Sequence, residues 1–422
     1  MELLEKILND KNLFKAYKQV YKNKGASGVD NVTVEELGHY MYLHKEEIKE
    51  QIRKRKYTPS PVRRVYIPKE NGDKRGLGIP TVVDRVIQQA IVQILSPIYE
   101  EQFSNNSYGF RPKRSCEKAV IKLLEYFNDG YNWIVDIDLE KFFDNVCHDK
   151  LISIIMKTIH DGELVSLIRK YLVSGVMENG IISPTRVGTP QGGNLSPLLS
   201  NIMLNELDKE LEKRELNFVR YADDCIIVVK SEKAANRVMK SITKFIEKKL
   251  GLKVNMTKSK VAKPNDIKYL GYGFYNKNNK WKPKPHIKSI EKFKRKLKQL
   301  TKRNWSISIV ERIVRINQVI RGWINYFKIA NMKYCLVSIT KHLNRRIKCV
   351  IWKQWKTCAN RIRNLMRLGV YENNAKKTAY SRKKYWALSN SINIDYAINN
   401  KRLKANGLIF PIEYYTKVHI EI

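Results

Sequence analysis

The chain has 422 residues and a mass of 49.5 kDa, more than one ordinary hydrophobic core holds, so two or three domains are predicted. Hydrophobic residues make up 43% of it, which indicates a folded protein rather than a disordered one. Lys and Arg number 80 against 41 Asp and Glu, a net charge of +39. Such an excess repels itself in a compact fold and predicts a polyanionic partner, with nucleic acid favoured.

The excess positive charge is unevenly placed along the chain. Residues 280–422 carry 34 basic and 6 acidic side chains, a net charge of +28, which leaves +11 for residues 1–279. Because the basic part is not one amphipathic helix, a membrane-surface role is disfavoured. The pattern predicts a chemically mixed domain followed by a nucleic-acid-binding arm.

Membrane, secretory and zinc-binding signals are weak in this sequence. No segment approaches the ~20 apolar residues of a membrane span, and Glu2, Glu5 and Lys6 argue against a signal peptide. We therefore expect a cytoplasmic protein with no membrane partner. The six cysteines are scattered, with no C-x-x-C pair, so reduced thiols are favoured over disulfides or a zinc-bearing nuclease module.

The N-terminal third begins with helices and a hairpin. Apolar spacing over residues 2–22, broken near Asp10, predicts a small helical head. Alternation over residues 57–68, a turn at residues 71–73 and further apolar residues up to Ile79 predict a β-hairpin. Two helices are expected next, over residues 81–95 and over residues 115–127, the second capped by Ser115.

The middle of the chain mixes strands and helices. Residues 133–139 predict a short buried strand, and Ser196-Pro197 predicts a helix start with Ser196 as its cap. Residues 218–229 predict two strands around a polar break at residues 222–224. This irregular alternation predicts an α+β domain whose sheet is at least partly antiparallel.

Beyond Pro285 the pattern is helical with basic faces, over residues 287–302, 307–328 and 336–359. In the second of these helices, the rings of Trp323, Tyr326 and Phe327 are best explained as packing residues. Strand signals return only over residues 408–422. The C-terminal third is therefore expected to be helical up to that last segment.

Acidic residues inside this basic protein need an explanation that composition does not supply. Asp223 and Asp224 are adjacent and flanked by apolar runs, and neighbouring carboxylates repel each other unless they face solvent or share a cation. Alone, this dipeptide is better explained as an ordinary Asp-rich turn. Asp136, Asp138 and Asp144, however, surround a second apolar strand.

Carboxylates brought together from two strands would suit a pair of Mg²⁺ ions, which prefer hard oxygen ligands and lie ~3.5 to 4 Å apart in phosphoryl-transfer sites. Asp136 and Asp138 share one face of their strand, so periodicity does not choose between them. The three glycines of residues 188–194 would let backbone approach a ligand closely, although such a loop alone is a weak signal. Lys69 and Arg75, on the expected hairpin, are either a solvated charged turn or cations for a triphosphate.

Seven blocks along the chain carry a more specific pattern. They are Arg64-Val-Tyr-Ile-Pro68 with Arg75-Gly-Leu-Gly-Ile-Pro80, Ser107-Tyr-Gly-Phe-Arg-Pro112, Asp138-Leu-Glu-Lys-Phe-Phe-Asp144, Gly188-Thr-Pro-Gln-Gly-Gly193, Tyr221-Ala-Asp-Asp224, Leu250-Gly-Leu-Lys253 and Tyr269-Leu-Gly271. In this order they resemble the reverse transcriptase and maturase proteins encoded by bacterial group II introns, in the smaller class that lacks an endonuclease domain. The resemblance covers nearly the whole chain.

The resemblance implies an α+β right-hand polymerase with fingers and an antiparallel palm sheet, an all-helical thumb or maturase domain and a basic C-terminal tail. The implied boundaries are an N-terminal extension over residues 1–35, fingers and palm over 36–278, thumb and maturase (X) domain over 279–375, and a DNA-binding region over 376–422.

The resemblance also implies roles for individual residues. It selects Asp138 over Asp136, because in the family the first metal ligand lies five residues before an aromatic that blocks a ribose 2′-hydroxyl, here Phe143. Asp138, Asp223 and Asp224 are then the catalytic metal ligands. The implied nucleotide-binding residues are Lys69, Arg75, Phe143, Gln191 and Lys258, with Lys253 and Lys260 as open alternatives to Lys258. The implied nucleic-acid-binding residues are Lys24, Arg63, Arg64, Arg111, Arg382, Lys383 and Lys384.

The function implied is an RNA-directed DNA polymerase using two Mg²⁺ ions, with Mn²⁺ as a substitute. Its expected partners are dNTPs, an RNA template with a DNA primer, the group II intron RNA whose splicing it assists, and the target DNA of retrohoming. The alternatives are a splicing maturase acting without protein chemistry, and a retron-like or domesticated reverse transcriptase. An RNA-dependent RNA polymerase would use the same metal-binding carboxylates, but it would not need Phe143 to exclude a ribose 2′-hydroxyl.

Overall fold

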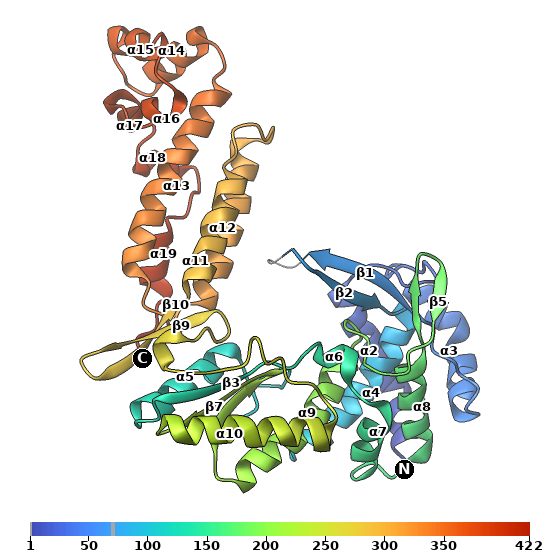
Figure 1. The fold of residues 1–422 in the computed structure, drawn as a ribbon. Helices are drawn as coiled ribbons and strands as arrows, with labels where there is room; N and C mark the ends of the chain where they lie inside the picture. The colour runs from blue at the N-terminus through green and yellow to red at the C-terminus, as the bar shows by residue number, and fades with distance from the viewer. Residues whose placement is uncertain (1, 69–71) are drawn as a thin grey trace. The chain divides into compact units, whose positions relative to one another are not determined.

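The structure is a computed structural model that describes residues 2–68 and 72–422. The chain folds into two compact units, residues 1–263 and residues 264–422 (Figure 1). Helices dominate both units, and the strands among the described residues form three sheets, so the predicted α+β class is confirmed. The domain boundaries proposed from the sequence stay predictions.

The first unit alternates helices with short strands. Its elements are α1 (Leu3–Leu8), α2 (Asp10–Asn23), α3 (Leu37–Arg53), β1 (Val62–Pro68), β2 (Lys74–Ile79), α4 (Val82–Glu100), α5 (Cys116–Asn128), β3 (Trp133–Ile137), α6 (Phe142–Asn145), α7 (His148–Met156), α8 (Gly162–Val173), β4 (Val176–Glu178), β5 (Ile181–Ser183), α9 (Ser196–Lys213), β6 (Asn217–Tyr221), β7 (Asp224–Val229), α10 (Glu232–Phe245), a π-helical turn η1 (Ile246–Leu250) and β8 (Lys260–Ala262).

The second unit is almost entirely helical. Its elements are a 3₁₀ turn η2 (Pro264–Asp266), β9 (Tyr272–Lys277), β10 (Lys280–Pro285), α11 (Ile287–Leu300), α12 (Ile309–Tyr326), α13 (Lys333–Gln354), α14 (Cys358–Arg367), α15 (Glu372–Ala379), α16 (Tyr385–Leu388), α17 (Ile392–Ala397), α18 (Asn400–Ala405) and α19 (Pro411–Val418).

Two sheets organise the first unit. The antiparallel sheet has the strand order β6-β7-β3-β8, and α10 packs against β3, β7 and β8 (Figure 1). The other sheet has the order β2-β1-β4-β5, in which β1 and β2 form the antiparallel hairpin that the sequence predicts. The antiparallel sheet is the one that carries the candidate metal ligands, because Asp138 follows β3 and Asp224 begins β7.

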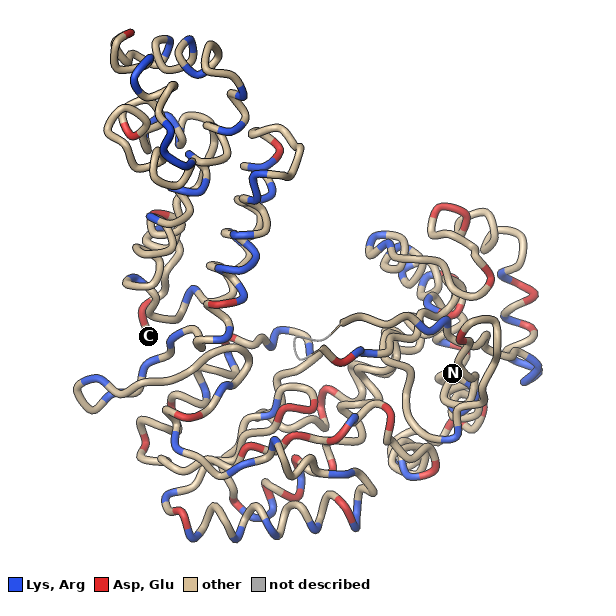
Figure 2. Tube along the Cα trace, turned by 45° about the horizontal axis from the view of Figure 1, so that its top comes forward, with Lys and Arg blue, Asp and Glu red and all other residues tan. Residues whose placement is uncertain are grey.

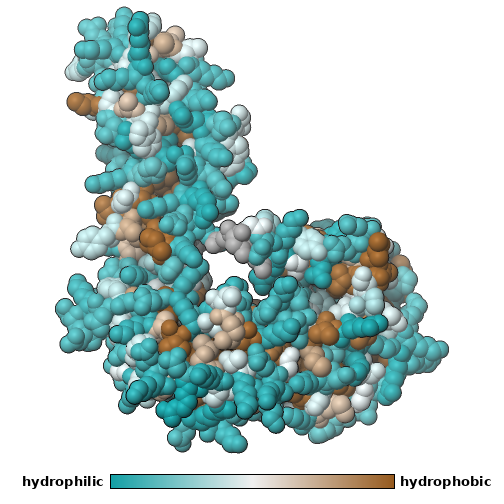
Figure 3. Space-filling view, viewed as in Figure 1, coloured by the Kyte–Doolittle hydropathy of each residue, from teal (hydrophilic) through white to brown (hydrophobic). Residues whose placement is uncertain are grey.

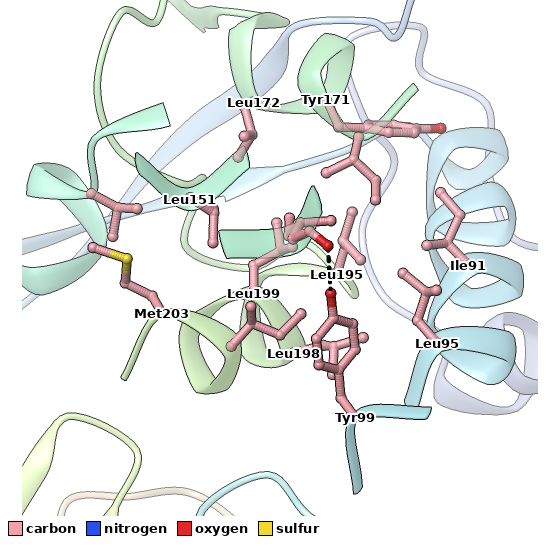
Figure 4. Close-up of a cluster of buried hydrophobic side chains, with 14 of the residues drawn as sticks. Ile91, Leu95, Tyr99, Leu151, Tyr171, Leu172, Leu195, Leu198, Leu199 and Met203 are labelled. Atoms are coloured by element: carbon pink, nitrogen blue, oxygen red, sulfur yellow. Dashed lines mark hydrogen bonds between the residues drawn. The ribbon is translucent and has the colours of Figure 1, made fainter. Parts of the chain in front are cut away.

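A continuous apolar core underlies the first unit. Figure 4 shows part of it, where side chains of α4, α7, α8 and α9 converge. At its edge the Tyr99 hydroxyl donates a hydrogen bond of 3.4 Å to the Ile155 carbonyl, so this polar group is satisfied inside the core (Figure 4). The residues labelled there are Ile91, Leu95, Tyr99, Leu151, Tyr171, Leu172, Leu195, Leu198, Leu199 and Met203. Helix α9 therefore packs against α4 and α7 through this core.

In the second unit, aromatic side chains tie α11 to α12. Phe293 and Trp323 stack with ring centroids 4.4 Å apart, and Phe327 is buried beside Trp323. The packing role expected for the rings of α12 is thus confirmed for these two. Tyr326 is more exposed, but its hydroxyl donates to the Leu270 carbonyl at 2.8 Å.

Most predicted elements are confirmed with shifted ends, including the Ser115 cap of α5. The expectation that Ser196 caps α9 is wrong: Leu195 holds the N-cap position, and the Ser196 hydroxyl donates to the Pro190 carbonyl at 2.7 Å. All six cysteines are free thiols, as expected.

The strand expected over residues 408–422 is also wrong, because Pro411–Val418 forms α19. Proline fits the first turn of a helix, and the buried Pro411 and Tyr415 lie four residues apart on one helical face. A hairpin of β9 and β10 went unpredicted. Its two-residue turn, Asn278-Asn279, has φ of +54° and +60°, values that Asn tolerates and hairpins favour.

Candidate active site and nucleic-acid surface

A two-residue turn between β6 and β7 carries the paired aspartates. Tyr221 pairs with Asp224 across the hairpin, so Ala222 and Asp223 form the turn itself, and Ala222 has a φ of +57°. We call β6, this turn and β7 the aspartate hairpin. The hairpin leaves Asp224 exposed and Asp223 half-buried.

Asp138 lies beside this hairpin because of strand register. Ile137, the last residue of β3, pairs with Cys225 of β7, so the next residue along, Asp138, is placed next to the start of β7. Its backbone is held by the Asn255 amide, which donates to the Asp138 carbonyl at 2.8 Å. Lys258 Nζ lies 3.5 Å from Asp138 Oδ2, which favours Lys258 over Lys253 and Lys260 as the lysine of this site.

The carboxylates influence one another electrostatically. Burial raises the pKa of Asp223, and the charge of Asp138 raises it further, while the guanidiniums of Arg75 and Arg220 act in the opposite direction. Burial also raises the pKa of Asp136, to about 6. Asp138 is therefore close enough for its charge to act on the Asp223 carboxylate.

The donor set suits a hard divalent cation only in combination with substrate. Among residues 2–68 and 72–422, no three His, Cys, Asp or Glu side chains lie together in an arrangement that would hold a metal ion by themselves. Magnesium in phosphoryl-transfer enzymes is usually held by one or two carboxylates plus substrate phosphates, rather than by an all-protein cage. A bound cation would offset the repulsion between the negative charges of Asp138 and Asp223.

The glycine-containing loop before α9 is fastened to the segment that carries Phe143. The Thr189 amide donates to the Phe143 carbonyl at 2.6 Å. At Gly188, where φ is +96°, a Cβ atom would lie 2.8 Å from that same carbonyl oxygen, so only glycine fits there. Phe143, Arg64 and Gln191 line a hollow of about 380 Å³.

The β1–β2 hairpin reaches the same hollow. Arg75 Nε donates to Gln191 Oε1 at 2.9 Å, and the Gly78 amide donates to the Gln191 carbonyl at 2.7 Å. The positive charge of Arg75 also opposes the rise in the pKa of Asp223. Arg75 therefore interacts both with Gln191 of this hollow and with the aspartate hairpin. The predicted residue Lys69 lies outside the described residues.

The residues predicted to bind nucleic acid differ in exposure. Lys24, Arg382, Lys383 and Lys384 are exposed, whereas Arg63 and Arg64 of β1 are half-buried.

Arg111 needs a correction, because it is buried. Its guanidinium pairs with both carboxylate oxygens of Glu100 at 3.0 and 2.9 Å and also donates to the carbonyls of Ser104 and Ser107. Those bonds use the donors that a phosphate would need, so the structure gives Arg111 an internal, loop-bracing position.

A cationic groove of the second unit was missed from the sequence. One hollow of about 420 Å³ lies between α11 and α13, and another of about 590 Å³ adjoins it, sharing Arg346. We call their combined lining the basic groove; its cations and ring are Lys294, Arg295, Lys298, Lys302, Arg303, Arg346, Lys353 and Tyr385. The available signal was the four-residue spacing of Lys294, Lys298 and Lys302, which places them along one side of the chain.

The cations of the basic groove also act on a histidine that lines it. Burial lowers the pKa of His342, and the charges of Arg346 and Lys294 lower it further. Arg303 lies over the Tyr385 ring, 5.0 Å from its centroid. Lys and Arg outnumber acids along the helices of this unit (Figure 2), and its visible face is largely hydrophilic (Figure 3).

Comparison with known proteins identifies both parts of the chain. Residues 67–274 match the family model for reverse transcriptase (RNA-dependent DNA polymerase), and residues 290–369 match the model for the group II intron maturase-specific domain. Protein YkfC of Escherichia coli (strain K12) is 31% identical in an alignment 350 residues long that covers 73% of this chain and 92% of that protein. The chain belongs to the group II intron-encoded reverse transcriptase and maturase family.

A second curated relative agrees with the family assignment. Group II intron-encoded protein LtrA of Lactococcus lactis subsp. cremoris is 43% identical over 217 residues, 50% of this chain, but the match spans only about a third (35%) of LtrA. A solved structure of telomerase from Candida albicans, in complex with a telomeric RNA fragment, aligns with a TM-score of 0.42 and 14% identity over 90% of this chain and 69% of that one.

As a family member, the chain is an RNA-directed DNA polymerase with a right-hand polymerase domain followed by a helical maturase domain. It binds nucleic acid, and its family works with divalent metal ions. Within the described residues, no helix is long and apolar enough to cross a membrane.

Proposed function

We propose that this reverse transcriptase copies an RNA template with two divalent cations held by Asp138, Asp223 and Asp224. The observation that carries the proposal is the register of β3 on β7, which brings Asp138 beside the aspartate hairpin and leaves two mutually repelling carboxylates in an otherwise basic protein. The ion proposed is Mg²⁺, with Mn²⁺ able to replace it, because both prefer carboxylate oxygens.

The proposed reaction is nucleotidyl transfer. The primer 3′-oxygen loses its proton and forms a bond to the α-phosphorus of a dNTP, while the bond from that phosphorus to the bridging oxygen breaks and pyrophosphate leaves. Bound divalent cations supply charge neutralisation at the attacking and leaving oxygens. Asp138, Asp223 and Asp224 would hold them together with the substrate's phosphate oxygens.

Other residues of the site would position the nucleotide. Arg75, together with Lys69, would bind the triphosphate, and Lys258 would lie by the leaving pyrophosphate because it already pairs with Asp138. Phe143 would close the sugar pocket against a ribose 2′-hydroxyl. Gln191 would lie against the incoming base pair, oriented by its bonds to Arg75 and Gly78.

The second unit would hold RNA by its backbone. Arg382, Lys383 and Lys384 are proposed to contact target DNA, and the basic groove would contact the phosphates of intron RNA or template. By the family's life cycle, the protein would assist splicing of its intron and copy that RNA into DNA during retrohoming, in the bacterial cytoplasm and at the nucleoid.

Primer extension tests the metal ligands. Replacing both Asp223 and Asp224 with alanine should reduce extension on an RNA template by roughly 10³-fold, because charge stabilisation of the transition state is lost. Affinity for the RNA template–DNA primer duplex should change less than about twofold, since the basic surface is untouched. Extension at the parental rate by this double variant would refute the site.

A splicing function without protein chemistry is the second candidate, supported by the maturase-domain match and the basic groove. It predicts that splicing of the cognate intron RNA survives the same double substitution. Because the two activities use different surfaces, both can belong to one molecule. Loss of splicing with retention of RNA binding would tie splicing to the metal ligands instead.

A further inference from the structure

A buried ion pair lies directly behind the aspartate hairpin. Arg220, in β6, and Asp208, in α9, are both fully buried, and the Arg220 Nε donates to Asp208 Oδ1 at 2.7 Å. A second bond joins Arg220 Nη2 to Asp208 Oδ2 at 2.5 Å. Buried ion pairs often contribute little net stability, because desolvation of both charges offsets their attraction. Stability alone therefore does not explain why this ion pair is buried behind the aspartate hairpin, and a role in positioning the hairpin is the alternative.

The same guanidinium holds the turn that carries Asp223. Arg220 Nη1 donates to the Ala222 carbonyl at 2.8 Å and to Asn201 Oδ1 at 3.1 Å, and Nη2 donates to Ser107 Oγ at 2.8 Å. Ala222 is the turn residue immediately before Asp223, and its φ of +57° is unusual for alanine. A rigid, charged donor on its carbonyl keeps this turn in one conformation.

A loop closes on the turn from another direction. Asn201 Nδ2 donates to the Gly109 carbonyl at 2.8 Å. Gly109 in turn lies so close that a Cβ atom there would be 2.2 Å from the Ala222 amide nitrogen. Asn201 thus bonds both to the guanidinium that holds the turn and to the loop that presses on it.

We propose that Arg220 and Asn201 are positioning residues, which fix the Ala222–Asp223 turn so that the Asp223 carboxylate meets its cation in one geometry. Asp208 orients the guanidinium through two hydrogen bonds. The inference rests on the proposed metal role of Asp223 and adds residues that touch neither metal nor substrate. A displacement of about 1 Å at a reacting group can cost ~100-fold in rate. Fixing the turn would therefore raise the rate of extension even if it adds nothing to the free energy of unfolding.

Helix α9 offers a matched pair of variants to test this. Asn205 lies one turn after Asn201 and is also buried; its Nδ2 donates to the Gln102 carbonyl at 3.2 Å, and its Oδ1 accepts from the Ser104 amide at 3.4 Å. Asn201→Ala and Asn205→Ala each remove two hydrogen bonds to neighbouring groups, but only Asn201 is bonded to the hairpin's support. Three readouts are needed: Mn²⁺ affinity by electron paramagnetic resonance in the presence of dNTP and a primer–template whose primer lacks the 3′-hydroxyl, kcat and dNTP KM for extension, and melting temperature.

Asn201→Ala should weaken Mn²⁺ binding by ~5-fold or more and lower kcat by ~10-fold or more, with dNTP KM changed less than twofold. Asn205→Ala should lower the melting temperature comparably, yet leave Mn²⁺ affinity and kcat within twofold of the parent. Equal effects of the two variants on Mn²⁺ affinity and kcat would overturn the proposal, because both would then act through stability alone.

Ser107→Ala extends the comparison if Asn201→Ala does not fold. It removes one bond from the Arg220 guanidinium and should show the same pattern of effects, at ~2- to 3-fold in Mn²⁺ affinity. No change in Mn²⁺ affinity for Ser107→Ala would count against the network. Failure of the metal site itself is separable, because it would show as retained activity when Asp223 and Asp224 are both alanine.

Discussion

The cation behind the aspartate hairpin is buried, whereas lysines of the basic groove are exposed to solvent. Around the hairpin, the cation Arg220 is fully buried and each of its bonds is directional, whereas Lys294 and Lys298 of the groove are exposed on a helix. Chemistry at a phosphorus atom depends on geometry within fractions of an ångström, but binding to a phosphate backbone depends mainly on the number of nearby charges. A change under the hairpin should therefore act on rate, and a change in the groove on affinity.

Among changes that leave the proposed metal ligands in place, Gly109→Ala is expected to have the largest effect, because its added Cβ would lie 2.2 Å from the Ala222 amide and must displace the turn. Extension should fall by ~100-fold or more, measured as kcat at saturating primer–template. Gly162→Ala is the control, since a Cβ there meets nothing within 4 Å. Parental kcat in Gly109→Ala would show that the hairpin tolerates displacement.

A triple substitution in the groove should change affinity instead. Replacing Lys294, Lys298 and Lys302 with Gln removes three cations, and each lost phosphate contact should make the slope of log affinity against log salt shallower by ~0.7 to 0.9. The slope should therefore decrease by roughly 2 to 3, with kcat at saturating RNA unchanged. Filter binding at several salt concentrations measures it.

Three exposed lysines of α10 serve as the matched control for that experiment: Lys233, Lys240 and Lys244. Their replacement by Gln removes the same net charge from the other unit. An equal loss of salt dependence in both triple variants would mean that net charge, rather than the groove, governs binding.

Phe143→Val should act on selectivity between sugars. Phe143 lines the hollow beside Gln191, and shortening it leaves room for a 2′-hydroxyl. The ratio of kcat/KM for rNTP to that for dNTP should rise by ~10-fold or more, as expected when a steric block is removed. An unchanged ratio would remove Phe143 from the sugar-discriminating role.

Lys258→Gln should have the smallest effect. Lys258 itself is largely exposed in its ion pair with Asp138, so the free energy of unfolding should change by less than ~1 kcal/mol. The dNTP KM should rise about threefold, an order-of-magnitude value for one exposed charge near a triphosphate. If KM stays at the parental value while Lys260→Gln raises it, the neighbouring lysine carries the role.

Much of the local structure and the family followed from the sequence alone. Alternation and turn chemistry predicted the β1–β2 hairpin and the two strands of the aspartate hairpin, because both patterns are local in the chain. The order of the motif blocks identified the family, which the matches to residues 67–274 and 290–369 confirm. The catalytic aspartates and the nucleotide-binding residues named from those motifs remain proposals.

Tertiary structure decided which charges face inward. Arg111 and Arg220 are both arginines beside turns in a basic chain, and nothing local distinguishes them from surface cations. Only the approach of Glu100 to one and of Asp208 to the other buries them, because a guanidinium leaves water only where carboxylates and carbonyls from distant segments meet its donors. The sequence by itself determined the elements, their order and the excess of positive charge; long-range packing determined which cations brace the fold and which remain for nucleic acid.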